Sequence, residues 1–446
     1  MGKRVKWKMT RILLVVLCAI ISLFSACVPM IKENPSEENQ ASVVTVISVE
    51  KILEGANSAY KVAFDDGTSK IFRFGEQSPM SIGTNGNWYF HGVDTGIFAD
   101  VFQKDEQGLT FYPLDDGTYA VGCGNAKYLS EIKIPTEQNG VKVTMIAPEG
   151  FKNAKNLTKI KIPEEIVTIG EYAFTDCNNL QSVVISDTVK TLEQNAFSGC
   201  AKLTSVDFGK GLTELGNCAF MYCETLEKIT LPDSLTAISD YAFYGCAELS
   251  SITFGKNVTE IGEFSFYDCD GIAEIEFPQT LQKIGECAFA DAGKIKRVKL
   301  PEGFEELGKY AFSGCLKLEE IVLPKSISSI GLAAFNNTAY SNDERNWENG
   351  CIYVNSVLIN VDASVTVTEI VIKEGTSLIG AYAFFNCASV SIVHIPQSVL
   401  YINEYVFYGC EKLSLINYKG SHADWEEVTI HEDNETLHSV TLTYGG

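Results

Sequence analysis

The chain has 446 residues, a formal net charge of -22 at pH 7 and a hydrophobic content of 46%. This length allows two or three compact domains, and the hydrophobic content is enough for a large folded core. The acidic balance excludes nucleic acid as a partner, because nucleic-acid binding needs a basic surface, and it argues against electrostatic docking on an anionic membrane.

Residues 1–26 have the organisation of an export signal. Basic residues without any acid precede residues 12–24. This apolar run is shorter than the roughly 20 residues that a membrane-spanning helix needs. The small residues Ser25 and Ala26 then lead to Cys27. This junction resembles a bacterial lipobox, in which the cysteine is lipidated and becomes the first residue of the mature protein. The alternative is a plain secretory signal, after which the protein is released.

Two segments separate the signal from the main body of the chain. Residues 27–43 are polar and show no apolar period, which is typical of a flexible tether. Residues 44–108 contain an Asp-Gly and an Asn-Gly hairpin signal and are predicted to form a small β module, which resembles a short module common in bacterial surface proteins. Trp88 of this module is a candidate for stacking on a sugar, although a small hairpin also needs aromatic side chains for its own core.

From residue 109 to residue 420 the sequence repeats every 23 residues, and each repeat is marked by a phenylalanine. These are Phe151, Phe174, Phe197, Phe220, Phe243, Phe266, Phe289, Phe312, Phe335, Phe384 and Phe407. A constant period of this length indicates a solenoid, in which each turn of the chain, called a coil below, packs on its neighbours. The wider gap after Phe335 holds one coil with an insertion at about residues 340–362, which is expected to form a hairpin beside the stack.

The residues within one repeat predict a strand and a filled interior. Ile160 and Ile162 alternate with polar residues as in a strand with one buried face, and Pro163 ends that strand. Phe174 is expected to point inward and to supply most of the apolar area of its coil. The strands of successive coils are then expected to form one long parallel sheet.

The repeat L-x-x-I-x-I-P-x-x-V-x-x-I-G-x-x-A-F-x-x-C resembles the BspA-type leucine-rich repeat of bacterial surface proteins, over about residues 109–446. The resemblance implies a leucine-rich repeat solenoid with a long parallel β-sheet on its concave face, closed by a C-terminal cap at residues 421–446. It also implies a cell-surface protein that adheres to host matrix proteins or to other cells.

Eight of the 14 cysteines occupy one position of the repeat. They are Cys177, Cys200, Cys223, Cys246, Cys269, Cys315, Cys387 and Cys410. Neighbouring thiols in such a ladder point in parallel rather than at each other, and Ala292 and Thr338 replace two of them. We therefore predict small, buried, reduced thiols, with neither disulfides nor a zinc site.

The sequence contains none of the common motifs of hydrolases, phosphate-binding loops or metalloproteases. We therefore predict that the protein is not an enzyme and has no cofactor. His422, His431 and His438 cluster in sequence with Glu432 and Asp433 near the C-terminus, which is a weak signal for a metal site. A polar loop on the cap is the interpretation that we favour.

The outward-facing strand positions vary from coil to coil and are the candidate binding surface. The charged residues selected there are Lys159, Lys161, Glu274, Glu276, Arg297 and Lys299. The acidic pair lies one coil from the pair Arg297 and Lys299, which fits a cross-strand ladder of weak, exposed ion pairs. The alternative is a recognition stripe on the concave surface.

Together these patterns predict an exported, lipid-anchored, monomeric repeat protein on the outer face of a bacterial membrane. Its expected partners are proteins or glycans of a host matrix or of other cells. Two alternatives remain open: a glycan- or substrate-capturing surface lipoprotein or associated enzyme, and a passive surface scaffold.

Overall fold

The structure, a computed structural model, describes residues 105 and 107–445 in full and, within residues 46–104, the backbone of seven strands. These strands are β1 (Val46–Leu53), β2 (Ala59–Phe64), β3 (Ser69–Arg73), β4 (Met80–Ile82), β5 (Asn87–Phe90), β6 (Val93–Phe98) and β7 (Gln103–Lys104). The predicted export signal, the tether and Cys27 lie outside the described residues. The chain divides into two compact units, Met1–Ser78 and Pro79–Gly446.

Both hairpins predicted for the N-terminal module are present. Strands β2 and β3 pair antiparallel on either side of the Asp-Gly signal, and β1 completes a three-stranded sheet in the first unit. Strands β4 and β5 pair antiparallel on either side of the Asn-Gly signal and form a separate three-stranded sheet with β6. The boundary between the two compact units therefore falls inside the predicted module of residues 44–108.

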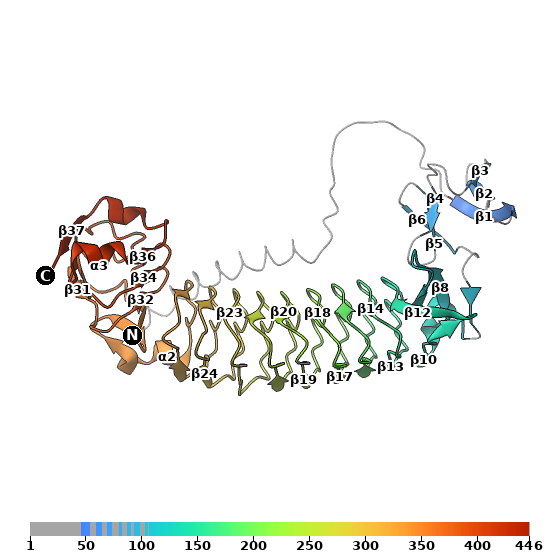
Figure 1. Cartoon of the computed structure of the whole chain (residues 1–446), viewed down its shortest axis with the longest axis horizontal. Coiled ribbons are helices and arrows are strands. Elements are labelled where there is room, and N and C mark those ends of the chain that lie inside the picture. Colours follow the sequence, from blue (N-terminus) through green and yellow to red (C-terminus); the bar gives the residue numbers. More distant parts are fainter. Residues whose placement is uncertain are drawn as a thin grey trace, which may run out of the picture. The chain divides into compact units, whose positions relative to one another are not determined.

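The second unit contains a parallel β-solenoid with a 23-residue repeat, as the phenylalanine spacing predicts (Figure 1). Lys159 pairs with Ser182, and Ser182 pairs with Ser205, so one coil is one repeat. Each regular coil contributes two strands. The first strand belongs to what we call the front sheet, and the second belongs to what we call the back ladder.

The front strands are β10 (Glu131–Lys133), β13 (Lys159–Lys161), β15 (Ser182–Val184), β17 (Ser205–Asp207), β19 (Lys228–Thr230), β21 (Ser251–Thr253), β24 (Arg297–Lys299), β26 (Glu320–Val322), β31 (Glu369–Val371), β33 (Ile392–Ile395), β35 (Leu415–Tyr418) and β37 (Thr441–Tyr444). The back ladder begins with β8 (Thr110–Pro113), β9 (Tyr119–Gly122) and β12 (Val141–Ile146), with β11 (Glu137–Gln138) beside β12. It continues through β14 (Thr168–Ile169), β16 (Thr191–Leu192), β18 (Glu214–Leu215), β20 (Ala237–Ile238), β22 (Glu260–Ile261), β23 (Lys283–Ile284), β25 (Glu306–Leu307), β27 (Ser329–Ile330), β30 (Val357–Val361), β32 (Leu378–Ile379), β34 (Tyr401–Ile402) and β36 (Thr429–Ile430).

Helical segments are short and lie at the two ends of the stack and in the insertion. They are η1 (Gly124–Tyr128), α2 (Ala339–Asn342), η2 (Glu344–Asn346), α3 (His422–Glu426) and η3 (Glu435–His438). Within the described part of the chain, no helix has the length and apolar character needed to cross a bilayer.

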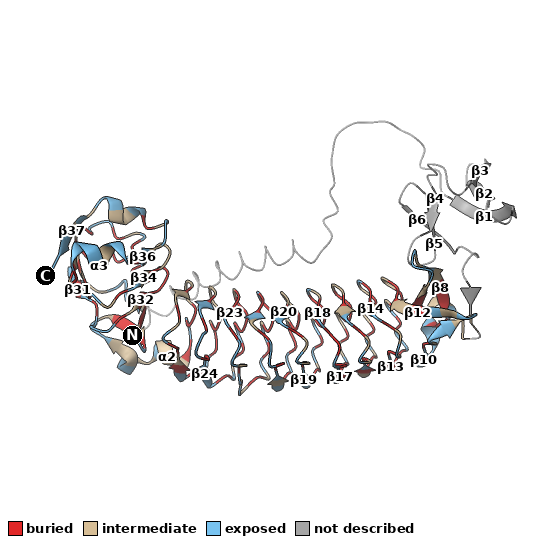
Figure 2. Ribbon diagram, in the orientation of Figure 1, coloured by how far each residue is buried: buried red, intermediate tan, exposed pale blue. Residues whose placement is uncertain are grey.

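The core is a stack of aromatic rings inside the coils. From Phe151 to Phe335 the repeat phenylalanines stack face to face, with neighbouring ring centroids 4.9 to 5.8 Å apart. Buried residues line the inside of the coils and exposed residues lie outside (Figure 2). They form two clusters, one between Leu109 and Leu378 and one between Cys351 and Val428. Each coil thus buries an apolar face that it could not bury alone.

The backbone of the repeat explains why glycine recurs four residues before the phenylalanine. The residues two before and two after each phenylalanine adopt a left-handed conformation, as at Tyr172 (φ 56°) and Asp176 (φ 59°). Gly170 does not need this conformation; a Cβ there would lie 2.6 Å from the main-chain nitrogen of Pro148 in the preceding coil. Glycine is therefore favoured at this position by the close approach of neighbouring coils.

The front sheet is not continuous, in contrast to the single long sheet expected from the sequence. It is divided into six, two and four strands. The first interruption lies between β21 and β24, where residues 274–276 occupy the strand position of the repeat but form no strand.

A bulky residue at one repeat position accounts for this interruption. The last inward position of the strand segment holds Ile162, Ile185, Leu231 or Leu300 in coils that pair fully with the next coil. It holds a phenylalanine in three others. The coil of Phe208 keeps a single residue pair with the next coil, and the coils of Phe254 and Phe277 form no strand pairing with the next coil. An aromatic ring needs more room there than an aliphatic side chain, and close-packed coils cannot supply it without separating.

The insertion causes the second interruption. Strand β29 (Cys351–Val354) pairs antiparallel with β30, so the predicted hairpin forms, and β28 (Trp347–Glu348) extends it. However, β30 also pairs in parallel with β32. The expectation of a hairpin beside the stack was therefore wrong in its placement. The hairpin supplies a strand of the back ladder, because Val357 and Leu358 are apolar and fully buried, Val357 in the first core cluster and Leu358 in the second.

The back ladder is divided as well, into sheets that end at β18, β27 and β36, and one side chain caps the open edge at β27. Strand β27 is the edge of a five-stranded ladder. The Oδ1 of Asn403 accepts a hydrogen bond from the N–H of Ile330 (2.8 Å), and its Nδ2 donates to the carbonyl of Ser328 (3.0 Å). Asn403 stands where most coils carry glycine, so its amide substitutes for the missing strand.

Candidate functional site

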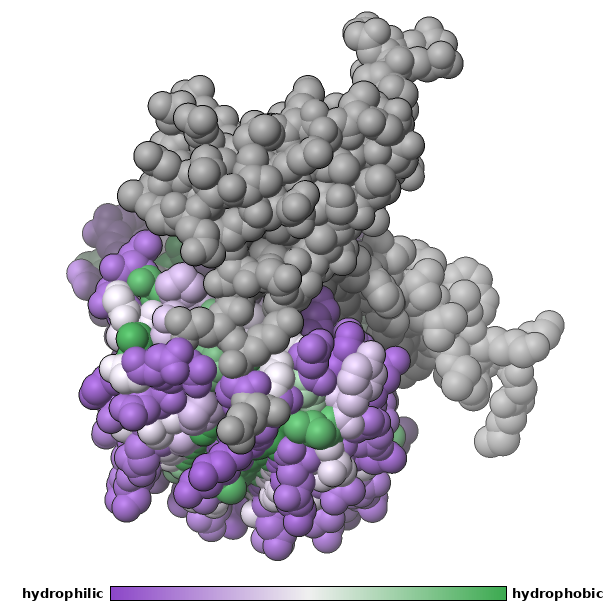
Figure 3. Space-filling view, turned by 90° about the vertical axis from the view of Figure 1, so that its right-hand side faces the viewer, coloured by the Kyte–Doolittle hydropathy of each residue, from purple (hydrophilic) through white to green (hydrophobic). Residues whose placement is uncertain are grey.

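On the side of the molecule seen in Figure 3, the surface of the described residues is mostly hydrophilic, and hydrophobic residues are scattered singly or in small groups. Hollows and local charge therefore distinguish the candidate sites.

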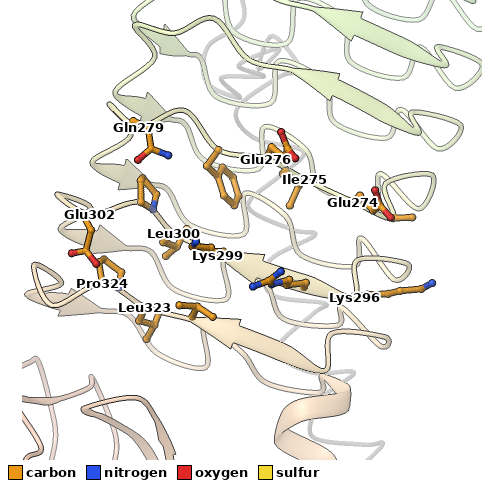
Figure 4. Close-up of a pocket in the computed structure, with 15 residues that line it drawn as sticks. Glu274, Ile275, Glu276, Gln279, Lys296, Lys299, Leu300, Glu302, Leu323 and Pro324 are labelled. Atoms are coloured by element: carbon orange, nitrogen blue, oxygen red, sulfur yellow. The ribbon is translucent and has the colours of Figure 1, made fainter.

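A groove of about 650 Å³ lies where the front sheet is first interrupted; we call it the break groove (Figure 4). Its walls come from three successive coils. Glu274, Ile275 and Glu276 lie on the first coil, and Lys296, Arg297, Lys299 and Leu300 lie on the second. Leu323 and Pro324 lie on the third. The groove thus combines an apolar floor with charged rims.

The main chain of the first coil that lines the groove, residues 274–276, is not paired with its neighbours. In regular coils the equivalent residues pair in register, as Val183 does with Ile160 and Val206. Among the described residues, no main-chain hydrogen bond joins Glu274, Ile275 or Glu276 to a neighbouring coil. Their N–H and C=O groups are available to a ligand or to water.

The charges of the groove are largely uncompensated. Arg297 pairs with Glu320 of the following coil (Nη2 to Oε1, 3.1 Å) rather than with the acidic pair of the preceding coil. Within the described part of the chain, Glu274, Glu276 and Lys299 take part in no ion pair, and all three are exposed. Negative and positive rims therefore face the same hollow without neutralising each other.

The other predicted site residues lie elsewhere. Lys159 and Lys161 are exposed on β13, in a regular part of the front sheet, and do not line the groove. Trp88 lies on β5, where its backbone pairs with Ile82; nothing of its side chain is described. The sequence signal that would have identified the groove is the phenylalanine at position 277, which sequence analysis did not distinguish from the aliphatic residues of other coils.

A second hollow, of about 470 Å³, lies where the back ladder meets the coil of β34. Glu286, Lys309, Glu404 and His431 are among the residues that line it. The Nζ of Lys309 lies 3.1 Å from Oε1 of Glu404. Burial, and then the neighbouring carboxylate of Glu263, raise the pKa of Glu286, while Lys309 opposes this shift.

This hollow also bears on the predicted histidine cluster. Ligand atoms of Glu404, His431 and Asp433 lie within 4.8 Å of one another and could hold a metal ion. His422 and His438 do not join them; the Nδ1 of His422 lies 3.7 Å from Glu426. The favoured role of this segment as a polar loop of the cap is compatible with this geometry, since Lys309 already neutralises Glu404. Glu404 was missed by sequence reasoning because it lies 27 residues before His431.

The cysteine ladder forms no disulfide among the described residues. All eight ladder thiols are free and buried. Each donates a hydrogen bond to the carbonyl of the residue 26 positions earlier, which is a phenylalanine for seven of them, as from Cys200 to Phe174 (3.2 Å), and Val361 for Cys387 (4.0 Å). Burial raises the pKa of the Cys387 thiol to about 12, and a side-chain hydrogen bond with Cys200 followed by burial raises the pKa of Cys177. The predicted reduced thiols are therefore neutral core groups rather than nucleophiles.

Comparison with known proteins agrees with the repeat described above. Six copies of a family described as "BspA type Leucine rich repeat region" match residues 144–269, 213–342 and 362–444. No curated protein sequence matches significantly.

Solved structures also match the chain. A leucine rich cell surface protein of Faecalibacterium prausnitzii is 24% identical, with 74% of this chain and 98% of that chain covered and a TM-score of 0.34. A leucine-rich repeat protein of Bacteroides ovatus is 24% identical, with 77% and 99% covered and a TM-score of 0.39. The pneumococcal vaccine antigen PcpA is 15% identical, with 77% and 97% covered and a TM-score of 0.37.

Proposed function

Because the chain belongs to the BspA-type leucine-rich repeat family, we propose that it is a bacterial cell-surface protein that binds other macromolecules and does not catalyse a reaction. The break groove is its binding site, and the protein acts as a monomer. Its partners are proteins of a host matrix or of other cells.

The interruption of the front sheet carries this proposal. A regular stretch of this sheet offers a repetitive surface whose main chain is fully paired. At the break groove, unpaired main-chain groups, an apolar floor and exposed charges of both signs converge within about 650 Å³. Such convergence of polar groups over an apolar floor is typical of binding sites.

A binding screen of the mature chain against purified matrix proteins, mucins and glycans tests the proposal. We expect at least one protein to bind. The combined change Glu274→Gln, Glu276→Gln and Lys299→Met should weaken that binding about tenfold or more. The matched control is Lys159→Met with Lys161→Met, which removes exposed charges from a regular part of the same sheet and should leave affinity unchanged.

Three results would contradict the proposal. Equal effects of the two sets of changes would remove the break groove from the binding site. Binding of glycans alone, lost in Trp88→Ala, would support a glycan-capturing lipoprotein. No binding to any member of the screen would support a passive scaffold.

We also propose that the protein is anchored to the outer face of the membrane through a lipid on Cys27. The small-residue junction after the apolar run of residues 12–24 supports this. Cells grown with a labelled fatty acid should label the wild type, and Cys27→Ala should lose the label and appear in the medium. An unlabelled wild type would instead indicate a secreted protein.

A further inference from the structure

We propose that the break groove binds an extended polypeptide segment in which one basic and one acidic side chain flank an apolar residue. This inference rests on the proposed function and specifies the chemistry of its partner. Three features of the groove lead to it: its unpaired main chain, its separated charges and the kind of apolar surface on its floor.

The unpaired main chain favours a polypeptide. Elsewhere on the front sheet, the residues equivalent to Glu274, Ile275 and Glu276 use their N–H and C=O groups in ladder hydrogen bonds. At the groove these groups have no partner in the described part of the chain. An extended segment carries donors and acceptors at the spacing of a strand, so it can satisfy such groups, as in other cases of strand addition.

The separated charges favour a segment of mixed sign. Glu274 and Glu276 lie on one coil, and Lys299 lies on the next coil. A purely acidic ligand would meet the two glutamates, and a purely basic ligand would meet Lys299. A segment with a basic and an acidic side chain, one residue apart, can pair with both rims at once.

The floor favours an aliphatic side chain over a sugar ring. Ile275, Leu300 and Leu323 contribute aliphatic surface between the rims. Phe277 is the one aromatic residue among those that line the groove, and it is 8% exposed. A sugar would need an accessible ring face on which to stack, and the groove does not offer one. The apolar residue between the two charged ones therefore contacts this floor.

Short labelled peptides in fluorescence anisotropy with the mature chain test the inference. The probes are acetylated, amidated peptides with the core Lys-Val-Glu, Gln-Val-Gln, Lys-Val-Lys or Glu-Val-Glu. Exposed ion pairs contribute up to about fivefold each in affinity, so Lys-Val-Glu should bind several-fold more tightly than Gln-Val-Gln. Methylation of the valine nitrogen of Lys-Val-Glu should weaken binding further, because one main-chain donor is lost.

A charge reversal provides the sharper test. Lys299→Glu places a third carboxylate at the groove, beside Lys296 and Arg297 of the same coil, so the preference for Lys-Val-Glu over Lys-Val-Lys should be lost or reversed. The matched control, Lys161→Glu, reverses a charge of the same kind on β13 and should keep the wild-type preference. Gln-Val-Gln binding as tightly as Lys-Val-Glu, or the same switch in both variants, would overturn the inference.

The outcomes separate this inference from the proposed function. If a folded protein binds the wild type and loses affinity in the groove variants, but no peptide binds, the groove is a binding site for a folded surface and the inference fails alone. If neither proteins nor peptides bind, both fail.

Discussion

At the scale of single residues, the repeated cysteine has a role that its size alone does not explain. Its S–H donates to the carbonyl of the phenylalanine in the preceding coil, as from Cys246 to Phe220 (3.3 Å). The contact gives a buried carbonyl one more hydrogen bond without adding volume. Ala292 occupies this position in one coil, so the bond contributes to stability but is not essential.

The ladder thiols should be unreactive in the native protein. Burial raises the pKa of Cys246, so the thiolate is scarce and inaccessible, whereas Cys123 is half-buried and its pKa is raised only to about 11. Alkylation followed by mass spectrometry should label Cys123 first and Cys246 only after denaturation. Cys246→Ala should lower the free energy of unfolding by roughly 1–2 kcal/mol through the lost hydrogen bond and a small cavity. Paired cysteines in the native mass would contradict this account.

Glu286 should make stability depend on pH. Its pKa is raised in the folded protein, mainly by burial and then by Glu263. The folded state therefore retains a proton that the unfolded state has lost, and the free energy of unfolding falls as pH rises from the ordinary glutamate pKa through the raised value. Glu286→Gln should flatten this dependence and stabilise the protein at neutral pH, as measured by urea unfolding between pH 4 and 8. The exposed Glu274→Gln is the control, and identical pH profiles for both variants would contradict the assignment.

At the scale of secondary structure elements, departures from the repeat determine where the fold becomes irregular. Phe277 stands where most coils carry an aliphatic residue, and the strand segment of its coil does not pair with β24 of the next coil. Asn403 replaces a glycine, and an edge strand gains a cap. The regular coils could be predicted from the sequence because one position has one role in every repeat. These two departures could not, because their effect depends on coils that lie next to them in space, 73 residues away in the case of Asn403 and Ile330.

Replacing the bulky residue should repair the front sheet. Phe277→Leu introduces the residue that stands at position 300, where pairing with the next coil is complete. The amides of residues 274–276 should then exchange more slowly with deuterium, the break groove should narrow, and partner binding should weaken. Stability should change by less than about 1.5 kcal/mol, because the apolar area lost with the ring is offset by relief of the crowding and by the recovered ladder hydrogen bonds. Phe208→Leu is the control, and it should leave binding unchanged; unaltered exchange in Phe277→Leu would refute the steric explanation.

Removing the cap on β27 should uncouple the two ends of the solenoid. Asn403→Ala leaves the N–H of Ile330 and the carbonyl of Ser328 without their partner, at a cost of about 1–3 kcal/mol. Thermal unfolding should then separate into two transitions, with the coils after the insertion melting first. Asn257→Ala removes an exposed side-chain bond to Asp233 within the regular stack and should have a smaller effect. A single transition in both variants would show that the coupling lies elsewhere.

At the scale of the whole molecule, the solenoid unit has two buried clusters that meet at the insertion. A stack of this kind is stabilised locally, since each coil contacts only its neighbours. A local irregularity such as the break groove can therefore be kept without loss of the fold, because the phenylalanine stack continues past it from Phe266 to Phe289 at 5.1 Å. The regular coils hold the shape, and the irregular coil offers the candidate site.

What could be predicted from the sequence also differs between the regular coils and the irregular coil. The period, the buried phenylalanines and the buried thiols could be predicted, because each is repeated many times. Four of the selected surface residues line the break groove, but the sequence indicated them as a charge ladder rather than as opposed rims. That difference arises from the lost pairing around residues 274–276, which no single repeat reveals.

Hydrogen–deuterium exchange of the mature chain, free and with a bound protein from the screen, tests the central claim most directly. In the free protein, the amides of Glu274, Ile275 and Glu276 should exchange fast, while those of Ile160 and Val183 in regular strands exchange slowly. In the complex, the first three should become protected. Slow exchange at these residues in the free protein, or protection on binding that appears only around Lys161 or His431, would contradict the assignment of the break groove as the binding site.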